Sequence, residues 1–439
     1  MANNNAINQE QLSFDSIFDE SKETESTKIE PNNKNKTQPI KQDRNTFPIN
    51  LVIDFNHFID HIKHNQVSLT KIKEYITKKH LPLIDEQMSI KAQSTPSNAQ
   101  QEHYPYIHLF YHLALSGHLV EKVSVGSGNL LLKITPRWNA YTELTDTEKY
   151  LFLLETFWVD MNWTNLLSKE NNRIRVQLLL PDIFTKLLDE KARYRIDLNK
   201  ETMLANLIYD WNYFLLFIEW FNLWVCERDQ EKTDFVKTIT LTPFGRNMVT
   251  ILMCARNIDT WNIALRRENG EVNPLPGTPL PEIFEDTKKI DQSSQPFYLA
   301  FADLFPKRDL HGSLPRIERK FTEGAHTFKI ALNGKVWRKV VLSAKHTMED
   351  LHNVIIRTFG FDDDHLYSFF MDGKKWSQDC IVAPHDDTGS PNAAEVTIGS
   401  VGMRAGQRFM YLFDYGNEWV FTIKVEQIQE TEPEPGTQY

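Results

Sequence analysis

The amino-acid sequence predicts a multidomain α+β protein, with a mostly helical first part that holds two winged-helix-like units, then a small sheet packed on one main helix. Three observations predict this class. The 439 residues are too many for one hydrophobic core, and 41% of them are hydrophobic, which is enough to build several. A pattern of an apolar helix and a hairpin occurs twice in the first part. Near the carboxyl end, apolar residues alternate on both sides of an Asn-Gly turn, which is typical of a β-hairpin.

The first segment, residues 1–46, is rich in Asn, Gln, Lys, Glu, Ser and Thr. Such a composition buries too little apolar surface to offset the entropy lost on ordering, so we expect a disordered head. Apolar residues at helical spacing then predict a helix over 52–62. A second helix is expected over 69–80, with Ser68 as its N-cap and Ile72 on its apolar face.

Each copy of the repeated pattern has an apolar helix, two strands that form a hairpin, and a Thr-Pro pair. The segments are helix 104–115, strands 119–125 and 129–134, and Thr135-Pro136, then helix 204–221, strands 223–227 and 235–241, and Thr242-Pro243. Thr is a good helix cap and Pro suits the first helical position, so each pair predicts a new helix. This order is the second half of a winged helix. We therefore interpret 47–140 and 141–266 as two winged-helix-like units, with helices over 147–163 and 181–189 at the front of the second.

A Pro-rich segment, residues 267–320, is interpreted as a linker that carries one short helix over 298–304. Five cations in this linker could contact the phosphates of a nucleic acid: Lys307, Arg308, Arg316, Arg319 and Lys320.

The last module, residues 321–429, is predicted to contain one helix and at least five strands, followed by an acidic tail over 430–439. Thr347 is expected to cap the helix and Gly360 to end it. The strands are expected over 328–332, 337–342, 366–371, 409–413 and 419–426, with room for one more strand before residue 409.

Four sequence blocks in this module resemble the plasmid pRiA4b ORF-3-like family, which is found among bacterial plasmids, mobile elements and genomes. The blocks are Val336-Trp337-Arg338-Lys339-Val340; Leu351-His352 with Ile355; Gly360-Phe361-Asp362-Asp363-Asp364-His365-Leu366-Tyr367-Ser368-Phe369; and Tyr411-Leu412-Phe413-Asp414-Tyr415-Gly416-Asn417-Glu418-Trp419. The resemblance implies a fold for the module and a link to plasmid or mobile-element biology, and it implies no particular activity.

This chain departs from the family's usual Trp at Phe361 and from its usual Asp at Asn417. The second change removes one carboxylate, and with it a paired acid at this turn.

Polar and aromatic residues of these blocks are the strongest candidate ligand-binding site. They are Trp337, Arg338, His352, Asp363, His365, Asp414 and Trp419. If they converge, a His and an Asp could act as general acid and base, or two His and a carboxylate could bind a metal. The alternative is structural: Arg338 pairs with Asp414 or Asp363, and the Trp rings pack the helix against the sheet. We favour this alternative and expect neither a metal nor a cofactor, because no spacing here is specific for metal ligands.

Other reactive residues give weaker signals. Cys226, Cys254 and Cys380 are far apart, which predicts reduced thiols rather than disulfides or a metal site. The run His385-Asp386-Asp387 lies in a polar stretch and is expected to be solvated. The sequence contains no Gly-rich phosphate loop, nucleophile elbow or HExxH motif.

The charge pattern bears on nucleic-acid binding. The net charge is −10, so binding to phosphates would need a local concentration of cations. The helices at the recognition positions of the two winged-helix-like units, 104–117 and 204–221, contain no Lys or Arg. This argues against reading of bases in a groove.

We therefore expect a cytoplasmic interaction or adaptor protein without enzymatic activity, whose partner is another protein. The first alternative is a nucleic-acid-associated accessory factor that acts through the linker and the cations of the module. The second is a hydrolase or nuclease that uses His352, His365 and Asp414. The beginning of the sequence lacks the pattern of a secretory signal, and no stretch is long and apolar enough for a membrane span, which favours a cytoplasmic location.

Overall fold

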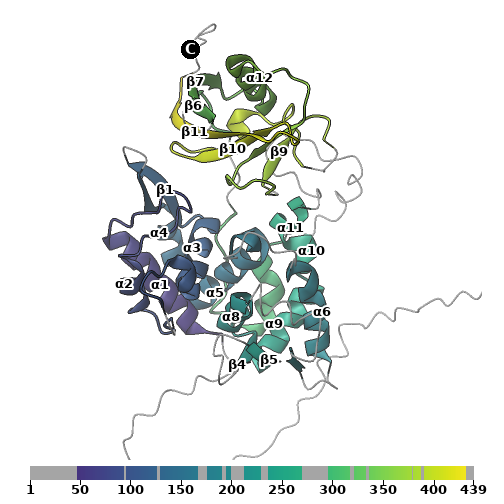
Figure 1. The fold of residues 1–439 in the computed structure, drawn as a ribbon. Coiled ribbons are helices and arrows are strands. Elements are labelled where there is room, and N and C mark those ends of the chain that lie inside the picture. The colour runs from purple at the N-terminus through teal and green to yellow at the C-terminus, as the bar shows by residue number, and fades with distance from the viewer. Residues whose placement is uncertain are drawn as a thin grey trace, which may run out of the picture. The chain divides into compact units, whose positions relative to one another are not determined.

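The computed structural model describes residues 47–92, 95–125, 129–166, 176–189, 194–198, 212–228, 236–268, 295–316, 321–332, 336–377, 379–386 and 390–431. Figure 1 shows the helices and strands of these residues. The predicted head, most of the Pro-rich half of the linker and most of the acidic tail lie outside the described residues. No described helix is both long and apolar enough to cross a membrane.

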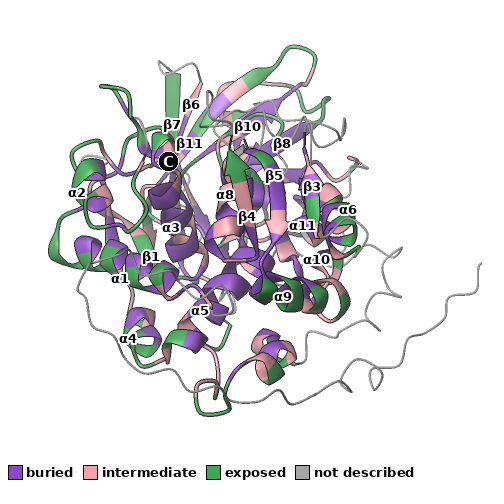
Figure 2. Cartoon of the chain, turned by 90° about the horizontal axis from the view of Figure 1, so that it is seen from below, coloured by how far each residue is buried: buried purple, intermediate pink, exposed green. Residues whose placement is uncertain are grey.

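Helices make up most of the first part, and their apolar faces share one core. They are α1 (Ile49–His64), α2 (Leu81–Asp85), α3 (Pro105–Ser116), α4 (Arg137–Thr142), α5 (Asp146–Glu155), α6 (Val176–Leu188), α8 (Asn212–Trp220), α9 (Pro243–Cys254), α10 (Ile258–Trp261) and α11 (Ile263–Glu268). Figure 2 shows α3 and α5 largely buried, while outer turns of α2 and α9 are exposed. The 3-10 helix η8 (Phe297–Leu304) matches the short helix expected in the linker and places Phe301 in the same core.

Both predicted hairpins of the first part form. The first pairs β1 (Val120–Val125) with β2 (Asn129–Ile134). The second pairs β4 (Trp224–Arg228) with β5 (Val236–Leu241), and β3 (Arg195–Asp197) pairs with the other edge of β5.

The two Thr-Pro pairs behave differently. Thr242 caps α9 as predicted, because its Oγ1 accepts a 2.7 Å hydrogen bond from the N–H of Gly245. In the first copy α4 begins at Arg137, and the Thr135 hydroxyl donates to the carbonyl oxygen of His118 instead. The hairpins of both copies and the helix of the first are present. The second helix is present as α8 over 212–220, and residues 204–211 of its predicted range lie outside the described residues; the winged-helix arrangement remains a prediction.

The prediction of a helix over 69–80 is wrong. The chain there extends the first hairpin: the N–H of Leu69 donates to the carbonyl oxygen of Leu130 at 2.9 Å, and Leu69 pairs with Ile76 across a turn. Ile72, expected on an apolar face, is 94% exposed. Pairing with the neighbouring strand therefore outweighs a local helical pattern, and tertiary context commonly overrides propensity in this way.

The C-terminal module is an antiparallel sheet with α12 (Met348–Phe359) on one face, as Figure 1 shows. The strand order is β7-β6-β11-β10-β8-β9. The strands are β6 (Ala325–Leu332), β7 (Val336–Ser343), β8 (Tyr367–Phe370), β9 (Cys380–Val382), β10 (Arg408–Phe413) and β11 (Trp419–Gln429). The predicted helix-on-sheet module is present, and β9 is the additional strand for which the sequence left room.

Local sequence explains why α12 forms where it does. The Thr347 side chain accepts a hydrogen bond from the N–H of Asp350, and the Asp350 carboxylate accepts one from the N–H of Thr347, which satisfies two of the unpaired donors at the helix start. Gly360 ends the helix with a φ of 73°, a left-handed conformation that glycine adopts readily. Between these caps, Leu351 and Ile355 are fully buried against the sheet.

Candidate functional site

His352 lies on the inner face of α12 and is 1% exposed. Its Nε2 lies 2.8 Å from Oδ1 of Asp363, and its Nδ1 lies 2.7 Å from the hydroxyl of Tyr411. The imidazole also stacks on the buried ring of Tyr367, with centroids 3.7 Å apart and planes at 9°. Both ring nitrogens are therefore occupied by partners within the module.

Burial lowers the pKa of His352, although the hydrogen bond and the charge of Asp363 act to raise it. A neutral imidazole carries one N–H, so Nε2 can donate to the Asp363 carboxylate while Nδ1 accepts from the Tyr411 hydroxyl. His352 can therefore bind a ligand, or exchange a proton with it, only after one of these two hydrogen bonds breaks.

Asp414 sits at the turn between β10 and β11 and is held by that turn. Its carboxylate accepts hydrogen bonds from the backbone N–H groups of Gly416 and Asn417 and, at 2.6 Å, from the side-chain amide of Asn417. These bonds, the Asn417 amide first, lower the pKa of Asp414. Asn417 therefore supplies a donor where a carboxylate would repel Asp414, which gives the sequence departure at this position a structural reason.

The structure divides the seven candidate residues among several places. Nε2 of His365 lies 3.5 Å from Oδ2 of Asp414, whereas His352 pairs with Asp363. Both imidazoles approach the ring of Phe413, with ring centroids 6.0 Å apart for His365 and 6.1 Å apart for His352. Trp419 starts β11 and packs on Phe361, at 5.0 Å between centroids.

Trp337 and Arg338 lie on β7, and as neighbours in a strand they point to opposite faces. The Arg338 guanidinium lies over Phe359 of α12, and the ammonium of Lys329 lies over Trp337. The expected pairing of Arg338 with Asp363 or Asp414 is not the one observed, since those carboxylates face His352 and His365.

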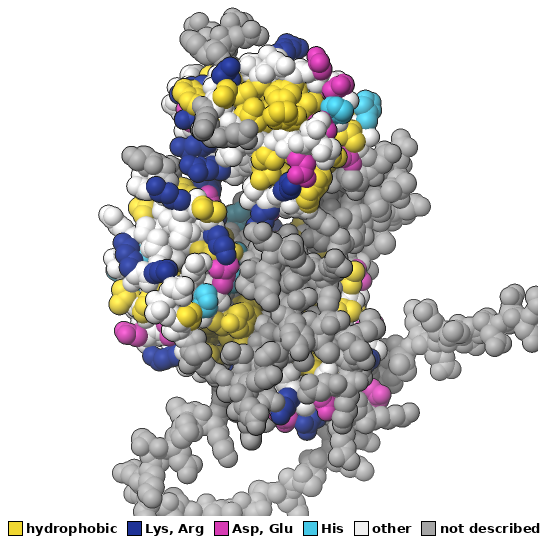
Figure 3. All heavy atoms as spheres, viewed as in Figure 1, with side chains coloured by type: hydrophobic (Ala, Val, Ile, Leu, Met, Phe, Trp, Pro, Cys, Tyr) yellow, Lys and Arg dark blue, Asp and Glu magenta, His cyan; other side chains and the backbone are white. Residues whose placement is uncertain are grey.

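Around the turn over 414–418, apolar side chains reach the surface. Trp419 packs on Phe361 on the α12 face of the sheet, whereas Trp376 packs on Phe370 on the other face. Because both flank this turn, we call Phe361, Leu366, Trp376 and Trp419 the aromatic edge. Trp376 is 53% exposed and Trp419 38%, and Trp376 packs on Tyr415 of the turn. Asp362, Asp364 and Glu418 are exposed carboxylates of the same segments, and Glu418 forms a 2.8 Å ion pair with Lys375, the residue before Trp376. Figure 3 shows hydrophobic side chains gathered on the visible face of the module, next to acidic and histidine side chains.

Sequence reasoning missed Trp376, Tyr367 and Tyr411. The two tyrosines sit at inward positions of β8 and β10, where alternation predicts burial. It does not predict that the Tyr411 hydroxyl and the ring of Tyr367 both contact His352. Trp376 lies in a polar loop and adopts a φ of 62°, and no periodic pattern marks it.

Comparison with known proteins finds a family match for the C-terminal module. Residues 325–439 match the family model described as plasmid pRiA4b ORF-3-like protein. The match covers the C-terminal module and leaves the helical part unassigned. No curated protein matches the chain.

One similar solved structure is a protein of unknown function, MM3350, from Methanosarcina mazei Go1. It is 22% identical, with a TM-score of 0.23, and the similarity covers 27% of this chain. The chain spans 66% of the length of that protein.

Within the described part of the chain, no group of three His, Cys, Asp or Glu side chains could hold a metal ion. In the pRiA4b ORF-3-like module the Asp386 carboxylate accepts a hydrogen bond from Tyr415, and Asp387 lies outside the described residues. Burial raises the pKa of the Cys226 and Cys380 thiols, which keeps them protonated and poorly nucleophilic.

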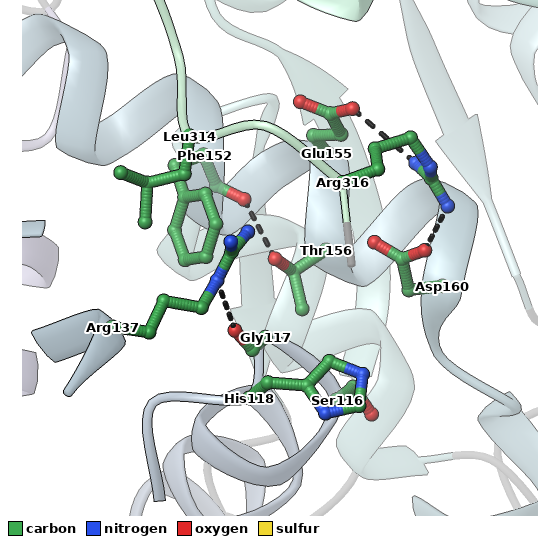
Figure 4. Close-up of a pocket in the computed structure, with 10 residues that line it drawn as sticks. All are labelled: Ser116, Gly117, His118, Arg137, Phe152, Glu155, Thr156, Asp160, Leu314 and Arg316. Carbon is green, nitrogen blue, oxygen red and sulfur yellow. Dashed lines mark hydrogen bonds and ion pairs between the residues drawn. The ribbon is translucent and has the colours of Figure 1, made fainter. Parts of the chain in front are cut away.

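The helical part contains a separate polar cavity of about 40 Å³. Figure 4 shows Arg316 between the carboxylates of Glu155 and Asp160, with Arg137 bound to the carbonyl oxygen of Gly117. Pockets for small organic ligands measure roughly 300–1,000 Å³, so this cavity has room for little more than water. Its charges hold the end of the linker rather than a substrate.

The five linker cations are thus not equivalent. Arg316 is engaged in the ion pairs of this cavity. Lys307 and Arg308 are exposed, and Arg308 lies 3.5 Å from Asp309. Arg319 and Lys320 lie outside the described residues.

Proposed function

We propose that this protein is a non-enzymatic interaction protein of the cytoplasm, and that its pRiA4b ORF-3-like module binds a basic segment of a partner protein at the aromatic edge. The observation that carries the proposal is the exposure of Trp376 and Trp419 beside exposed carboxylates. Trp is enriched among the residues that dominate binding energy at protein interfaces, and an acidic surround favours a partner of positive charge.

The geometry of the polar groups around His352 and Asp414 supports the same proposal. A general acid or base needs an atom within hydrogen-bond reach of a ligand. Both nitrogens of His352 are bound inside the module, and the Asp414 carboxylate is bound by its own turn. These groups are better suited to holding α12 and the β10–β11 turn in place than to chemistry, which weighs against the hydrolase alternative.

The proposal is tested by partner capture from an extract of the native cells, with purified full-length chain as bait. The test variant is Trp376→Ala with Trp419→Ala, and the matched control is Ile72→Ala with Leu83→Ala, which removes exposed apolar side chains of the helical part. We expect a protein that wild type and control retain and the tryptophan variant loses by at least about tenfold, since truncation of such anchors costs about 2 kcal/mol or more.

A second variant tests the charge of the partner. Asp362→Asn with Asp364→Asn should weaken capture of the same protein, and more salt should do so for wild type. Recovery of the same proteins by wild type and the tryptophan variant would contradict the proposal, as would recovery of nucleic acid with no protein partner.

A further inference from the structure

The face of the C-terminal sheet that points away from α12 carries a row of cations. Strand register places Lys339 of β7 opposite Lys329 of β6, Lys329 opposite Lys424 of β11, and Lys424 opposite Arg408 of β10. Directly paired residues share a face, so four positive side chains from four adjacent strands stand side by side. We call these four residues the cation row.

Packing on the two faces fixes which face this is. The alternate residues Ile330, Ile423 and Phe409 are buried in the core beneath α12. The ammonium of Lys329 lies 4.5 Å from the centroid of Trp337, which is 48% exposed and belongs to the row beside the cations. Figure 3 shows Lys and Arg side chains gathered on the side of β6 and β7.

The module itself neutralises little of this charge. Glu426 forms a 2.8 Å ion pair with Lys339. Among the described residues, no carboxylate forms an ion pair with Lys329, Lys424 or Arg408. Like charges directly opposite each other destabilise a sheet, so the cation row lowers the stability of the module when no anion is bound to it. A bound polyanion offsets this repulsion, because each cation then faces a negative group.

We propose that the cation row and Trp337 form a binding surface for single-stranded nucleic acid. Adjacent strands are roughly 4.8 Å apart, so the row runs roughly 14 Å across the sheet and can follow a phosphate backbone. The indole of Trp337 beside the row is 48% exposed, and the Lys329 ammonium lies over its ring. When Lys329 turns to a phosphate, a base can stack on this ring, and such stacking tolerates every base. Cations that track a backbone next to an aromatic platform are the recurring arrangement of single-strand binding.

This surface goes beyond the proposed function and is distinct from the aromatic edge. The cation row takes a polyanion, whereas the aromatic edge with its carboxylates takes a basic partner. A nucleic acid and a basic protein could therefore be held by the same module at the same time. Because different side chains carry the two proposals, the variants that test one leave the other intact.

The test is fluorescence anisotropy of the full-length chain with a labelled oligothymidine of about 16 nucleotides, between about 50 and 200 mM salt. Four phosphate contacts on a single strand give a slope of log K against log salt of about −3. Lys424→Gln with Arg408→Gln should reduce that slope by about 1.4, since each contact contributes about 0.7. Lys78→Gln with Lys79→Gln removes the same charge from exposed residues of the helical part and should leave the slope unchanged.

Stacking is tested separately. Trp337→Ala should weaken binding by roughly fivefold or more without changing the slope, and Trp337→Phe should restore most of the affinity. The charge of the partner is tested by competition with a poly-glutamate peptide and with a duplex of the same length.

Three results would overturn the inference. The first is an absence of binding at the lowest salt concentration. The second is a slope that responds equally to the cation-row variant and to its control. The third is a poly-glutamate peptide or a duplex that binds more tightly than the single strand, which would assign the surface to an acidic protein or to double-stranded nucleic acid.

Discussion

At the scale of single residues, His352 shows why a conspicuous histidine need not be catalytic. One ring nitrogen is hydrogen-bonded to the Tyr411 hydroxyl and the other to the Asp363 carboxylate, and the imidazole stacks on the ring of Tyr367. Tyr411→Phe removes the donor and leaves a buried acceptor unpaired, so we expect a loss of about 1–3 kcal/mol in the free energy of unfolding. Urea denaturation of the full-length variant measures this, and a loss well below 0.5 kcal/mol, about the level of a neutral surface change, would show that the network is not structural.

Glu155 makes a pH-dependent contribution to stability. Burial raises the pKa of this carboxyl from 4.5 to about 7, although Arg316 acts to lower it. A carboxyl whose pKa is raised on folding binds its proton more tightly in the folded state than in the unfolded state. As far as Glu155 is concerned, the protein is therefore most stable below pH 4.5, where this carboxyl is protonated in both states, and loses stability as the pH rises to about 7.

Glu155→Gln should therefore remove part of the fall in stability over this window, on the order of 2 kcal/mol. Denaturation midpoints of wild type and variant at a series of pH values measure the difference. If the two curves stay parallel between pH 4.5 and pH 7, the carboxyl has an ordinary pKa and the prediction is wrong.

At the scale of elements, the cation row has a consequence for stability. Lys424 stands between Lys329 and Arg408, so Lys424→Gln removes the charge repulsion with both of these residues. We expect the free energy of unfolding to rise by about 0.2–1 kcal/mol in low salt and the gain to shrink at high salt. Lys78→Gln, at an exposed site outside the sheet, serves as control and should change stability little. A variant less stable than wild type would show that the row is not repulsive.

Elements with strong local signals could be predicted from the sequence. Thr347 and Gly360 bound α12 as expected, and the two strands on either side of the predicted Asn-Gly turn, β6 and β7, pair with each other. The failure over 69–80 has a different origin, because the hydrogen bond from Leu69 to Leu130 joins segments far apart in the chain. Periodicity within one segment carries no information about such a partner.

The candidate site was predictable only in part for the same reason. The blocks that resemble the family lie in β7 and α12 and around the ends of β8, β10 and β11. Which histidine would face which carboxylate depends on strand register: Tyr411 stands opposite Phe369 and Phe421, on the face that meets α12. The cation row became visible only once the register of four strands was known, because its members lie far apart in sequence.

At the scale of the whole molecule, we assign stability to the interior of the pRiA4b ORF-3-like module and propose that binding occurs at its surface. The interior contains His352 with its two tyrosines, and the surface contains Trp376 and Trp419. An enzyme built on His352 would reverse this assignment, because the interior groups would then carry activity.

The most direct test measures partner retention and unfolding free energy on the same two full-length proteins, Tyr411→Phe and Trp376→Ala with Trp419→Ala. We expect the tyrosine variant to lose stability and to keep its partner at a temperature where it is folded. The tryptophan variant also loses some stability, because the packing of Trp419 on Phe361 and of Trp376 on Tyr415 is removed, but it should lose the partner even at a temperature where it is folded. A tyrosine variant that is as stable as wild type but no longer retains the partner, beside a tryptophan variant that retains it fully, would show that the interior binds the partner and the aromatic edge does not.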